Sequence, residues 1–146
     1  MDTVSVAHYI NGKLTASSGQ RRQDVFNPAT GAVSARVALA NQEDVDAAVA
    51  AATAAAPRWA ETAPLKRARI LFRFKELIER HHEALAATIT REHGKVLSDA
   101  RGEVTRGLEV VEFACGIPQL LKTQFTDNIG GGIDNWHLRQ PLGGTA

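Results

Sequence analysis

The periodicity of hydrophobic and polar positions changes twice along this chain. In the first 40 residues hydrophobic and polar positions alternate, as they do in short strands. Residues 9–14, Tyr-Ile-Asn-Gly-Lys-Leu, contain the Asn-Gly pair that favours a tight hairpin turn. A second turn is predicted at residues 27–31, between stretches whose β-branched residues suit half-buried strands. We therefore expect a strand and turn arm over residues 1–40 that lies against something larger.

The periodicity becomes helical at Asn41. Asparagine commonly caps helix N-termini with its side chain. Glu43 and Asp44 follow in the first turn, where acidic side chains face the positive end of the helix dipole. We expect Pro57 to end this helix, because proline lacks the backbone N–H that a helix interior needs.

A second helix is predicted from Pro64, since proline suits a first turn, to about His93, with Gly94 as its stop. Its apolar stripe continues to the two adjacent histidines at 81 and 82, where we expect a break. Glu76 and Arg80 are spaced to form an ion pair on the solvent side.

A third helix is expected to open at Ser98 as its N-cap. Apolar residues recur on one face of it: Val104, Leu108, Val111 and Cys115. A neighbouring stripe is also free of charge: Gly107, Val110, Ala114 and Leu121. A helix with two such faces requires burial on both sides.

The glycines at residues 130–132 then break the chain, and residues 133–140 are predicted to form a strand before Pro141. A glycine run can also cradle phosphate groups. A Walker A loop ends in Gly-Lys-Ser/Thr, however, and a dinucleotide-binding loop has a strand before it and a helix after it. This run meets neither condition, so we interpret it as a flexible linker into a strand.

The composition narrows the possible functions. With 17 Lys and Arg against 16 Asp and Glu, the net charge of +1 creates no extended field for nucleic acid or a membrane surface. The basic cluster at residues 66–75 is followed by the acidic Glu76 and Glu79, and we favour a solvated helix face over nucleic-acid binding. The longest weakly polar run, residues 47–56, is too short to span a bilayer. We expect neither nucleic-acid nor membrane partners.

Cys115 is the single cysteine, which excludes an intrachain disulfide and suits a reducing compartment, so we expect a cytoplasmic protein. Its place in a helical stripe favours a small buried hydrophobe over a nucleophile. The five histidines are not spaced to place two on one helix face, and no metal site is expected.

Arg106 stands apart among the charged residues. It lies one turn from Gly102 and next to Gly107, in a helix whose other faces are apolar. Its planar guanidinium could bind a carboxylate in a cavity, or it could pair locally with Glu103 or Glu109. Without further information local pairing is favoured, because long charged side chains on helices mostly reach solvent or a neighbour.

Several runs of residues carry a family resemblance. Three general ones are residues 9–13 (Tyr-Ile-Asn-Gly-Lys), 25–31 (Val-Phe-Asn-Pro-Ala-Thr-Gly) and 44–49, which leads to Trp59. Four more specific ones are residues 92–95 (Glu-His-Gly-Lys), 98–104, 106–114 and 131–136 (Gly-Gly-Ile-Asp-Asn-Trp). Together they resemble the N-terminal part of the aldehyde dehydrogenase superfamily and, within it, the CoA-acylating methylmalonate-semialdehyde dehydrogenases.

The resemblance implies an α/β fold with a strand arm and hairpin, three main helices and one terminal strand of the oligomerisation type, helix-dominated as it stands. It also implies a division into three segments. These are the arm at residues 1–40, the helical part of an incomplete cofactor-binding domain at 41–127, and a truncated oligomerisation-type strand at 128–146.

The resemblance further implies an activity. Such homo-oligomeric enzymes oxidise malonate or methylmalonate semialdehyde with NAD and transfer the acyl group to CoA, with loss of carbon dioxide, in valine, pyrimidine and inositol breakdown. Of the functional positions in the family only Arg106 has a match here, as the arginine that binds the substrate carboxylate. The nucleophilic cysteine and the dinucleotide fold would lie downstream. We therefore expect no catalytic residue in this chain and no strong binding of NAD or CoA.

At Gly144 the sequence leaves the pattern of the family, which continues as an apolar run into Pro-Phe-Asn. The resemblance thus implies a truncated or frame-shifted reading of a longer gene, marginally stable and inactive alone. The alternative is a non-catalytic helical interaction module that associates with an intact aldehyde dehydrogenase. A clean stop codon with no family remnant in the DNA beyond Ala146 would favour this alternative.

Overall fold

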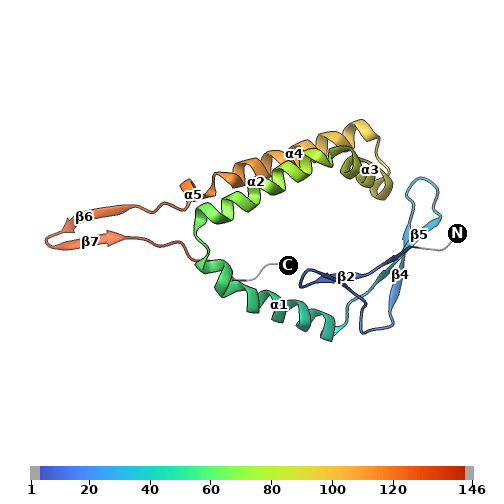
Figure 1. Ribbon diagram of the computed structural model, residues 1–146, viewed down its shortest axis with the longest axis horizontal. Helices are drawn as coiled ribbons and strands as arrows, with labels where there is room; N and C mark the ends of the chain where they lie inside the picture. The colour runs from blue at the N-terminus through green and yellow to red at the C-terminus, as the bar shows by residue number, and fades with distance from the viewer. Residues whose placement is uncertain (1–3, 144–146) are drawn as a thin grey trace.

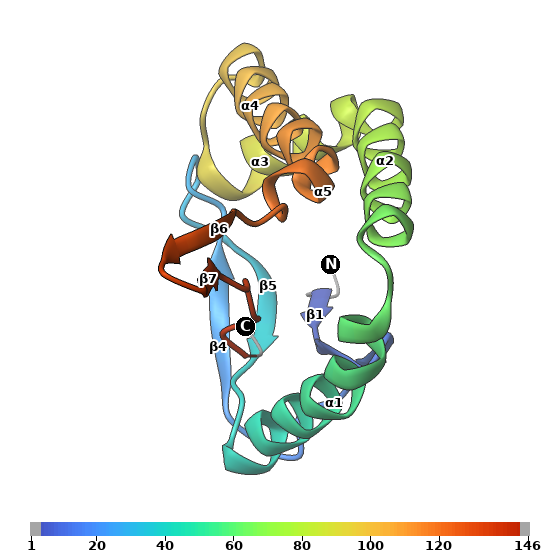
Figure 2. The ribbon, with the colours of Figure 1, turned by 90° about the vertical axis from the view of Figure 1, so that its left-hand side faces the viewer.

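The computed structural model describes residues 4–143, and their elements are arranged as an open frame (Figure 1). Helices α2 and α4 lie side by side along one edge, α1 runs along the opposite edge, and the strand arm joins them at one end. A β-hairpin projects from the other end. The view at right angles shows the same arrangement, with α3 beside α4 (Figure 2).

The arm consists of short strands in two groups. The strands are β1 (Val4–Val6), β2 (His8–Ile10), β3 (Lys13–Thr15), β4 (Arg22–Phe26) and β5 (Val33–Ala38). In the larger sheet β5 lies between β1, to which it is parallel, and β4, to which it is antiparallel. β2 and β3 form a separate antiparallel hairpin.

Both turns predicted in the arm are confirmed. Asn11 and Gly12 join β2 to β3 with φ values of 51° and 75°, the left-handed pair that matches the twist of a hairpin. In the turn between β4 and β5, the Gly31 N–H donates to the Asn27 carbonyl oxygen at 2.8 Å. The Asn27 side chain accepts from the Ala29 N–H at 2.9 Å and so fixes the turn from within.

Helix α1 (Gln42–Glu61) begins as predicted, because Asn41 caps it and accepts from the Asp44 N–H. The expectation that Pro57 ends the helix is wrong, since the helix continues for another turn. A proline in a helix removes one backbone hydrogen bond but can be accommodated where the flanking bonds hold. Thr62 ends the helix instead: its N–H donates to the Trp59 carbonyl and its hydroxyl to the Arg58 carbonyl.

The second helical stretch is divided at the predicted break. Helix α2 (Pro64–Arg80) and helix α3 (His82–His93) meet at His81, and Gly94 ends α3 with a φ of 86°. The Glu76–Arg80 ion pair forms at 2.7 Å. Pro64 stands in the first turn of α2 as expected.

Helix α4 (Leu97–Cys115) starts one residue before Ser98, and the short α5 (Ile117–Leu120) follows it. The prediction of Ser98 as N-cap is therefore wrong. Val96 holds the cap position without a side-chain hydrogen bond. Its carbonyl accepts from the N–H groups of Asp99 and Ala100, so backbone contacts define this helix start.

The core of the helical part is small and made of small side chains. Ala86 of α3 and Ala100 and Val104 of α4 are buried, with Ile78, Ile89 and Leu97 packed around them. Cys115 is 6% exposed and lies on the same face of α4, as a small buried hydrophobe. The second apolar stripe is only partly covered by the described residues, since Val110 remains 68% exposed while Ala114 and Leu121 are half-buried. Only one of the two apolar faces of α4 is packed against α2 and α3.

The C-terminal hairpin corrects two expectations. β6 (Phe125–Gly130) pairs with β7 (Ile133–Trp136), so the glycines close a hairpin turn rather than form a linker, and the predicted strand is shorter. β6 also begins inside the range 41–127 that we expected to be helical. The turn depends on side chains: the Asn128 N–H donates to Asp134 and the Gly132 N–H donates to Asn128. The expected departure at Gly144 lies outside the described residues.

Candidate functional site

The candidate site residue Arg106 lies on the face of α4 that is turned away from the other helices. It follows the buried Val104 by two residues, which corresponds to a rotation of about 200° around the helix axis. Since α2 and α3 pack against the Val104 face, the Arg106 side chain projects from the opposite face, where it is exposed.

The surroundings of Arg106 are open. A Cβ atom added to either Gly102 or Gly107 would have no heavy atom within 4 Å. Val110 lies one turn further along the same face and is mostly exposed. A planar ligand can therefore approach the guanidinium from this side without displacing a side chain of the described residues.

The local pairing that we considered for Arg106 does not form. Within residues 4–143, Arg106 has no ion pair within 4 Å with Glu103, with Glu109 or with any other carboxylate. Glu103 is bound to Lys95 instead. Arg106 thus presents its charge and its donor groups to solvent.

Lys95 is the centre of the charge cluster beside Arg106. It stands in the loop between α3 and α4, and its Nζ lies 2.6 Å from the Asp99 carboxylate and also contacts Glu103. The hydrogen bonds to Asp99 and Glu103 raise the pKa of Lys95 above its ordinary value of 10.5. The bond from Lys95 in turn lowers the pKa of Asp99, with a smaller contribution from Arg106.

An ion pair between α3 and α4 fixes the orientation of the α4 face that carries Arg106. The Arg101 Nε and Nη2 donate to the two oxygens of Glu83 at 3.0 and 2.8 Å. These hydrogen bonds lower the pKa of Glu83. His82 approaches Thr105 at 3.3 Å one turn later. Both contacts restrain rotation of α4 about its axis, and therefore the direction in which Arg106 projects.

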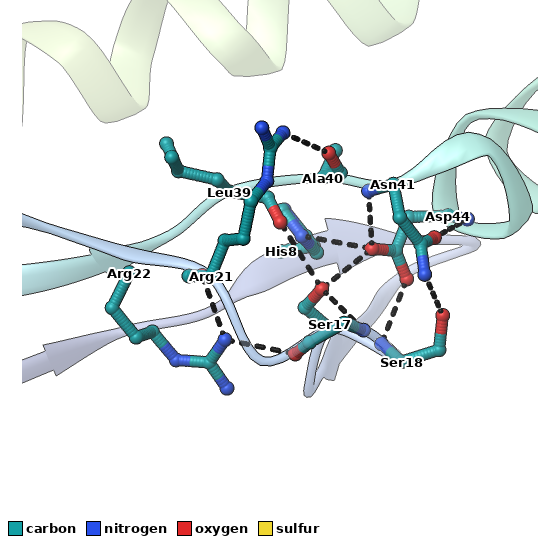
Figure 3. A network of polar contacts seen from close by, with 10 residues as sticks. His8, Ser17, Ser18, Arg21, Arg22, Leu39, Ala40, Asn41 and Asp44 are labelled. Carbon is teal, nitrogen blue, oxygen red and sulfur yellow. Dashed lines mark hydrogen bonds and ion pairs between the residues drawn. The ribbon is translucent and has the colours of Figure 1, made fainter.

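A second polar cluster lies at the start of α1, and Figure 3 shows it around the Asp44 carboxylate. This carboxylate accepts from the Ser17 hydroxyl at 2.6 Å and from the N–H groups of Ser18 and Asn41 at 3.1 and 3.0 Å. The hydrogen bond from Ser17, followed by those from Asn41 and Ser18, lowers the pKa of Asp44 to about 2. The cluster fastens the arm to α1, and it contains no group arranged as a nucleophile.

Sequence reasoning found only part of the Asp44 cluster. The spacing of Asn41 and Asp44 is that of a reciprocal capping box, which was visible as a helix start. Ser17 and Ser18 lie more than 20 residues earlier and gave no signal of their own. The His8 ring, 3.6 Å from Asp44, was equally hidden.

The turn at the tip of β4 and β5 reaches the loop that carries Lys95. A Cβ atom on Gly94 would lie 3.0 Å from the Pro28 ring, so the two residues are in close contact. Pro28 belongs to the arm and Gly94 ends α3. The arm thus supports the start of α4 as well as the start of α1.

Other functional groups are sparse in the described part of the chain. No group of three or more His, Cys, Asp or Glu side chains among residues 4–143 could hold a metal ion. None of the helices described is both long and apolar enough to cross a membrane. A cavity of about 190 Å³ beside Trp59 and Arg67 is lined largely by apolar side chains and does not include Arg106.

Comparison with known proteins gives a consistent result. The aldehyde dehydrogenase family profile matches residues 14–146. The malonate-semialdehyde dehydrogenase of Pseudomonas aeruginosa is 46% identical over 136 residues, which is 93% of this chain and 27% of that protein. The malonate-semialdehyde dehydrogenase 1 of Geobacillus kaustophilus is 46% identical over 97% of this chain and 29% of its own length.

Solved structures agree with the sequence comparisons. A methylmalonate-semialdehyde dehydrogenase of Sinorhizobium meliloti, complexed with NAD, superposes with a TM-score of 0.92 at 46% identity, over 97% of this chain and 29% of that one. The enzyme from Oceanimonas doudoroffii gives a TM-score of 0.87 at 48% identity, over 92% and 27%. The α/β fold expected from the sequence is confirmed, and the chain spans under a third of the length of these relatives.

Proposed function

This chain belongs to the aldehyde dehydrogenase family, and we propose that it forms the N-terminal part of an NAD-dependent, CoA-acylating malonate or methylmalonate-semialdehyde dehydrogenase. Such an enzyme oxidises the aldehyde carbon, loses carbon dioxide and delivers acetyl-CoA or propionyl-CoA, in the breakdown of valine, pyrimidines and inositol. Relatives that bear these names and share 46% identity support this substrate class over other aldehydes.

The observation that carries the proposal is the Arg106 guanidinium on the outer face of α4, which has no ion-pair partner among residues 4–143. A semialdehyde of this class bears a carboxylate at the end opposite its aldehyde. A planar guanidinium offers that carboxylate two parallel hydrogen bonds, which fixes its orientation as well as its position. Gly102 and Gly107 leave room for the substrate to approach Arg106.

The residues of this chain do not fit the binding of a dinucleotide. The glycines at 130–132 close the β6–β7 hairpin, whereas a dinucleotide-binding loop leads from a strand into a helix whose N-terminus receives the phosphates. Cys115 is buried and unsuited to attack an aldehyde. The proposal therefore assigns NAD, CoA and the nucleophile to other parts of the enzyme, and the 146-residue chain is inactive alone.

The same reading gives each segment a role. Residues 1–40 are the arm, and residues 41–127 hold the helical part of the cofactor-binding domain together with the first residues of β6. The last segment, 128–146, serves oligomerisation, and its hairpin begins at Phe125. Exposed apolar side chains on this hairpin, Ile133 and Trp136 among them, support contact with another subunit in a homo-oligomer. The single unpaired Cys115 supports a cytoplasmic location.

A non-catalytic interaction module remains the second candidate function. The exposed hairpin also favours this alternative, because it could join the oligomer of an intact aldehyde dehydrogenase without contributing to chemistry. In that case the direction of Arg106 has no bearing on any substrate. The two candidates thus differ in what Arg106 does.

A chimeric enzyme tests the proposal. Residues 14–143 replace the matching segment of the Pseudomonas aeruginosa malonate-semialdehyde dehydrogenase, and NADH formation is followed with malonate semialdehyde and with propanal, which lacks a carboxylate. We expect an active chimera in which Arg106→Gln raises the KM for malonate semialdehyde roughly 10- to 100-fold. The KM for propanal stays unchanged, as do both constants in the Arg73→Gln control. An equal loss for both aldehydes would contradict the assignment of Arg106.

A further inference from the structure

Two carboxylates that precede Arg106 on α4, those of Asp99 and Glu103, are held by a single lysine. Lys95 precedes α4, yet its side chain is only 14% exposed because it lies back along the first two turns of that helix. Its Nζ contacts Asp99 and, one turn further, Glu103. One ammonium group therefore binds both acidic side chains on this side of the helix start.

Glu103 is the residue that would otherwise pair with Arg106. It precedes Arg106 by three residues, so the two side chains are neighbours on the helix surface, and an acid before a base at this spacing is the favourable order. An acid and a base four residues apart in the same order do pair on the exposed surface of α2, as Glu76 does with Arg80. The Glu103–Arg106 pair is absent although its spacing allows it.

We propose that Lys95 is a positioning residue for Arg106: by holding the Asp99 and Glu103 carboxylates, it leaves the Arg106 guanidinium free to receive the carboxylate of a ligand. That Arg106 is kept free for the carboxylate of a ligand rests on the proposed function. The structural content of the inference, that Lys95 diverts Glu103 from Arg106, stands on the contacts alone.

The position of Lys95 is itself fixed by the fold. Gly94 adopts a left-handed φ and lies against Pro28, which sets the path of the chain into Lys95. The raised pKa of Lys95 keeps the ammonium charged at every pH at which an enzyme of this kind works. Glu109, three residues after Arg106, stands in the less favourable order and makes no ion pair with it among the described residues.

Arginine modification tests the proposal on the full 146-residue chain. Phenylglyoxal attacks the unprotonated guanidine, so an ion pair that stabilises the charged form slows the reaction. The rate at Arg106 is measured by peptide mass spectrometry relative to Arg73, an exposed arginine of α2, in the same sample. Circular dichroism of each variant verifies that the helices are intact.

We expect Lys95→Met to slow the modification of Arg106 about twofold, the factor that corresponds to one exposed helical ion pair. Adding Glu103→Gln to Lys95→Met restores the wild-type rate, because the released carboxylate is gone. Lys95→Arg keeps the wild-type rate, since it preserves the cation. Lys75→Met, which breaks a matched pair on α2, leaves the Arg106 rate unchanged.

Two results would overturn the proposal. One is an unchanged Arg106 rate in Lys95→Met with intact helices, and the other is a slow rate that persists in the Lys95→Met/Glu103→Gln variant. Neither depends on turnover, so a failure here is separate from a failure of the chimeric enzyme. If Arg106→Gln affects both aldehydes equally in the chimera but these rates behave as expected, Lys95 still holds Glu103 away from Arg106 and the substrate assignment falls.

Discussion

Arg101 of α4 and Glu83 of α3 form a two-point ion pair, with the Arg101 Nε and Nη2 at 3.0 and 2.8 Å from the two carboxylate oxygens. The pair crosses from one helix to the next over 18 residues of chain. It lies one turn from Thr105 and one residue before Gly102, so it holds the part of α4 that carries Arg106. The geometry of the candidate site therefore depends on a contact made outside it.

The first prediction concerns this ion pair. Arg101→Lys keeps the charge but loses the planar two-point geometry, and we expect a small decrease in the urea midpoint of unfolding, because the pair is largely solvated. Hydrogen exchange of the α4 amides should increase more than that of the α2 amides. A uniform increase over both helices would contradict a local role in holding α4.

A second prediction concerns the packed face of α4. Val104→Ala removes two methyl groups from the small core around Ala86 and Ala100, and we expect a loss of about 2 kcal/mol in the free energy of unfolding. The matched control is Val110→Ala on the exposed face of the same helix, with an effect within about 0.5 kcal/mol. Urea unfolding followed by circular dichroism measures both. Equal effects would mean that the two faces of α4 are buried alike in solution.

The third prediction is a dependence of stability on pH that originates at Asp44. The pKa of Asp44 is about 2 in the folded chain and 3.8 without its hydrogen bonds. Since the folded value is the lower one, the contribution of Asp44 is fully present above about pH 4 and is lost as the pH falls toward 2. Asp44→Asn should be less stable than the wild type at pH 7 and should show a flatter decline between pH 4 and pH 2. A parallel decline in both proteins would assign acid sensitivity to other carboxylates.

The fourth prediction separates backbone strain from contact at Gly94. Gly94→Ala places a Cβ at a left-handed φ of 86° and within 3.0 Å of Pro28, so we expect a loss of about 2 kcal/mol or more. Gly132→Ala is the control, because its φ is 85° and a Cβ there has open space; it should cost about 1 kcal/mol. The difference between the two measures the contact of the arm with the end of α3. No difference would mean that the Pro28 turn does not rest on Gly94 in solution.

The fifth prediction concerns the isolated chain. We expect no NADH formation from malonate semialdehyde with NAD and CoA, because its only thiol, Cys115, is 6% exposed. A thiol reagent such as dithionitrobenzoate should react slowly with the native chain and rapidly in urea. Turnover above the blank, abolished by Cys115→Ser, would contradict the buried, inert role of this cysteine.

Local signals in the sequence predicted most of the elements correctly. The Asn11–Gly12 turn, the Asn41 cap and the Gly94 stop each depend on the conformational preferences of one or two residues, so they can be recognised without knowledge of the rest of the fold. Pro57 was misjudged for a related reason. The end of α1 is set by the hydrogen bonds of Thr62, and the helix propensity of proline takes no account of such contacts.

The strand β6 was missed because its central residues are polar and its positions show little alternation. Phe125 and Thr126 become strand residues by pairing with Trp136 and Asn135, and the side chains of Asn128 and Asp134 hold the turn between them. Such pairing couples residues that are distant in sequence, and strand propensity is weak compared with it. The direction of the hairpin away from the helices is likewise visible only in the structure (Figure 1).

The sequence by itself determined the family, most of the elements in their order and the choice of Arg106, because family motifs and helical periodicity are encoded in neighbouring residues. Only the tertiary structure decided that Arg106 has no ion-pair partner in the described part of the chain. Spacing along α4 favours an ion pair with Glu103, whereas Lys95, placed by the close contact of Gly94 with Pro28, takes that carboxylate. Spacing along one helix does not predict how cations from different parts of the chain compete for one carboxylate. Here that competition determines which cation remains available to a ligand.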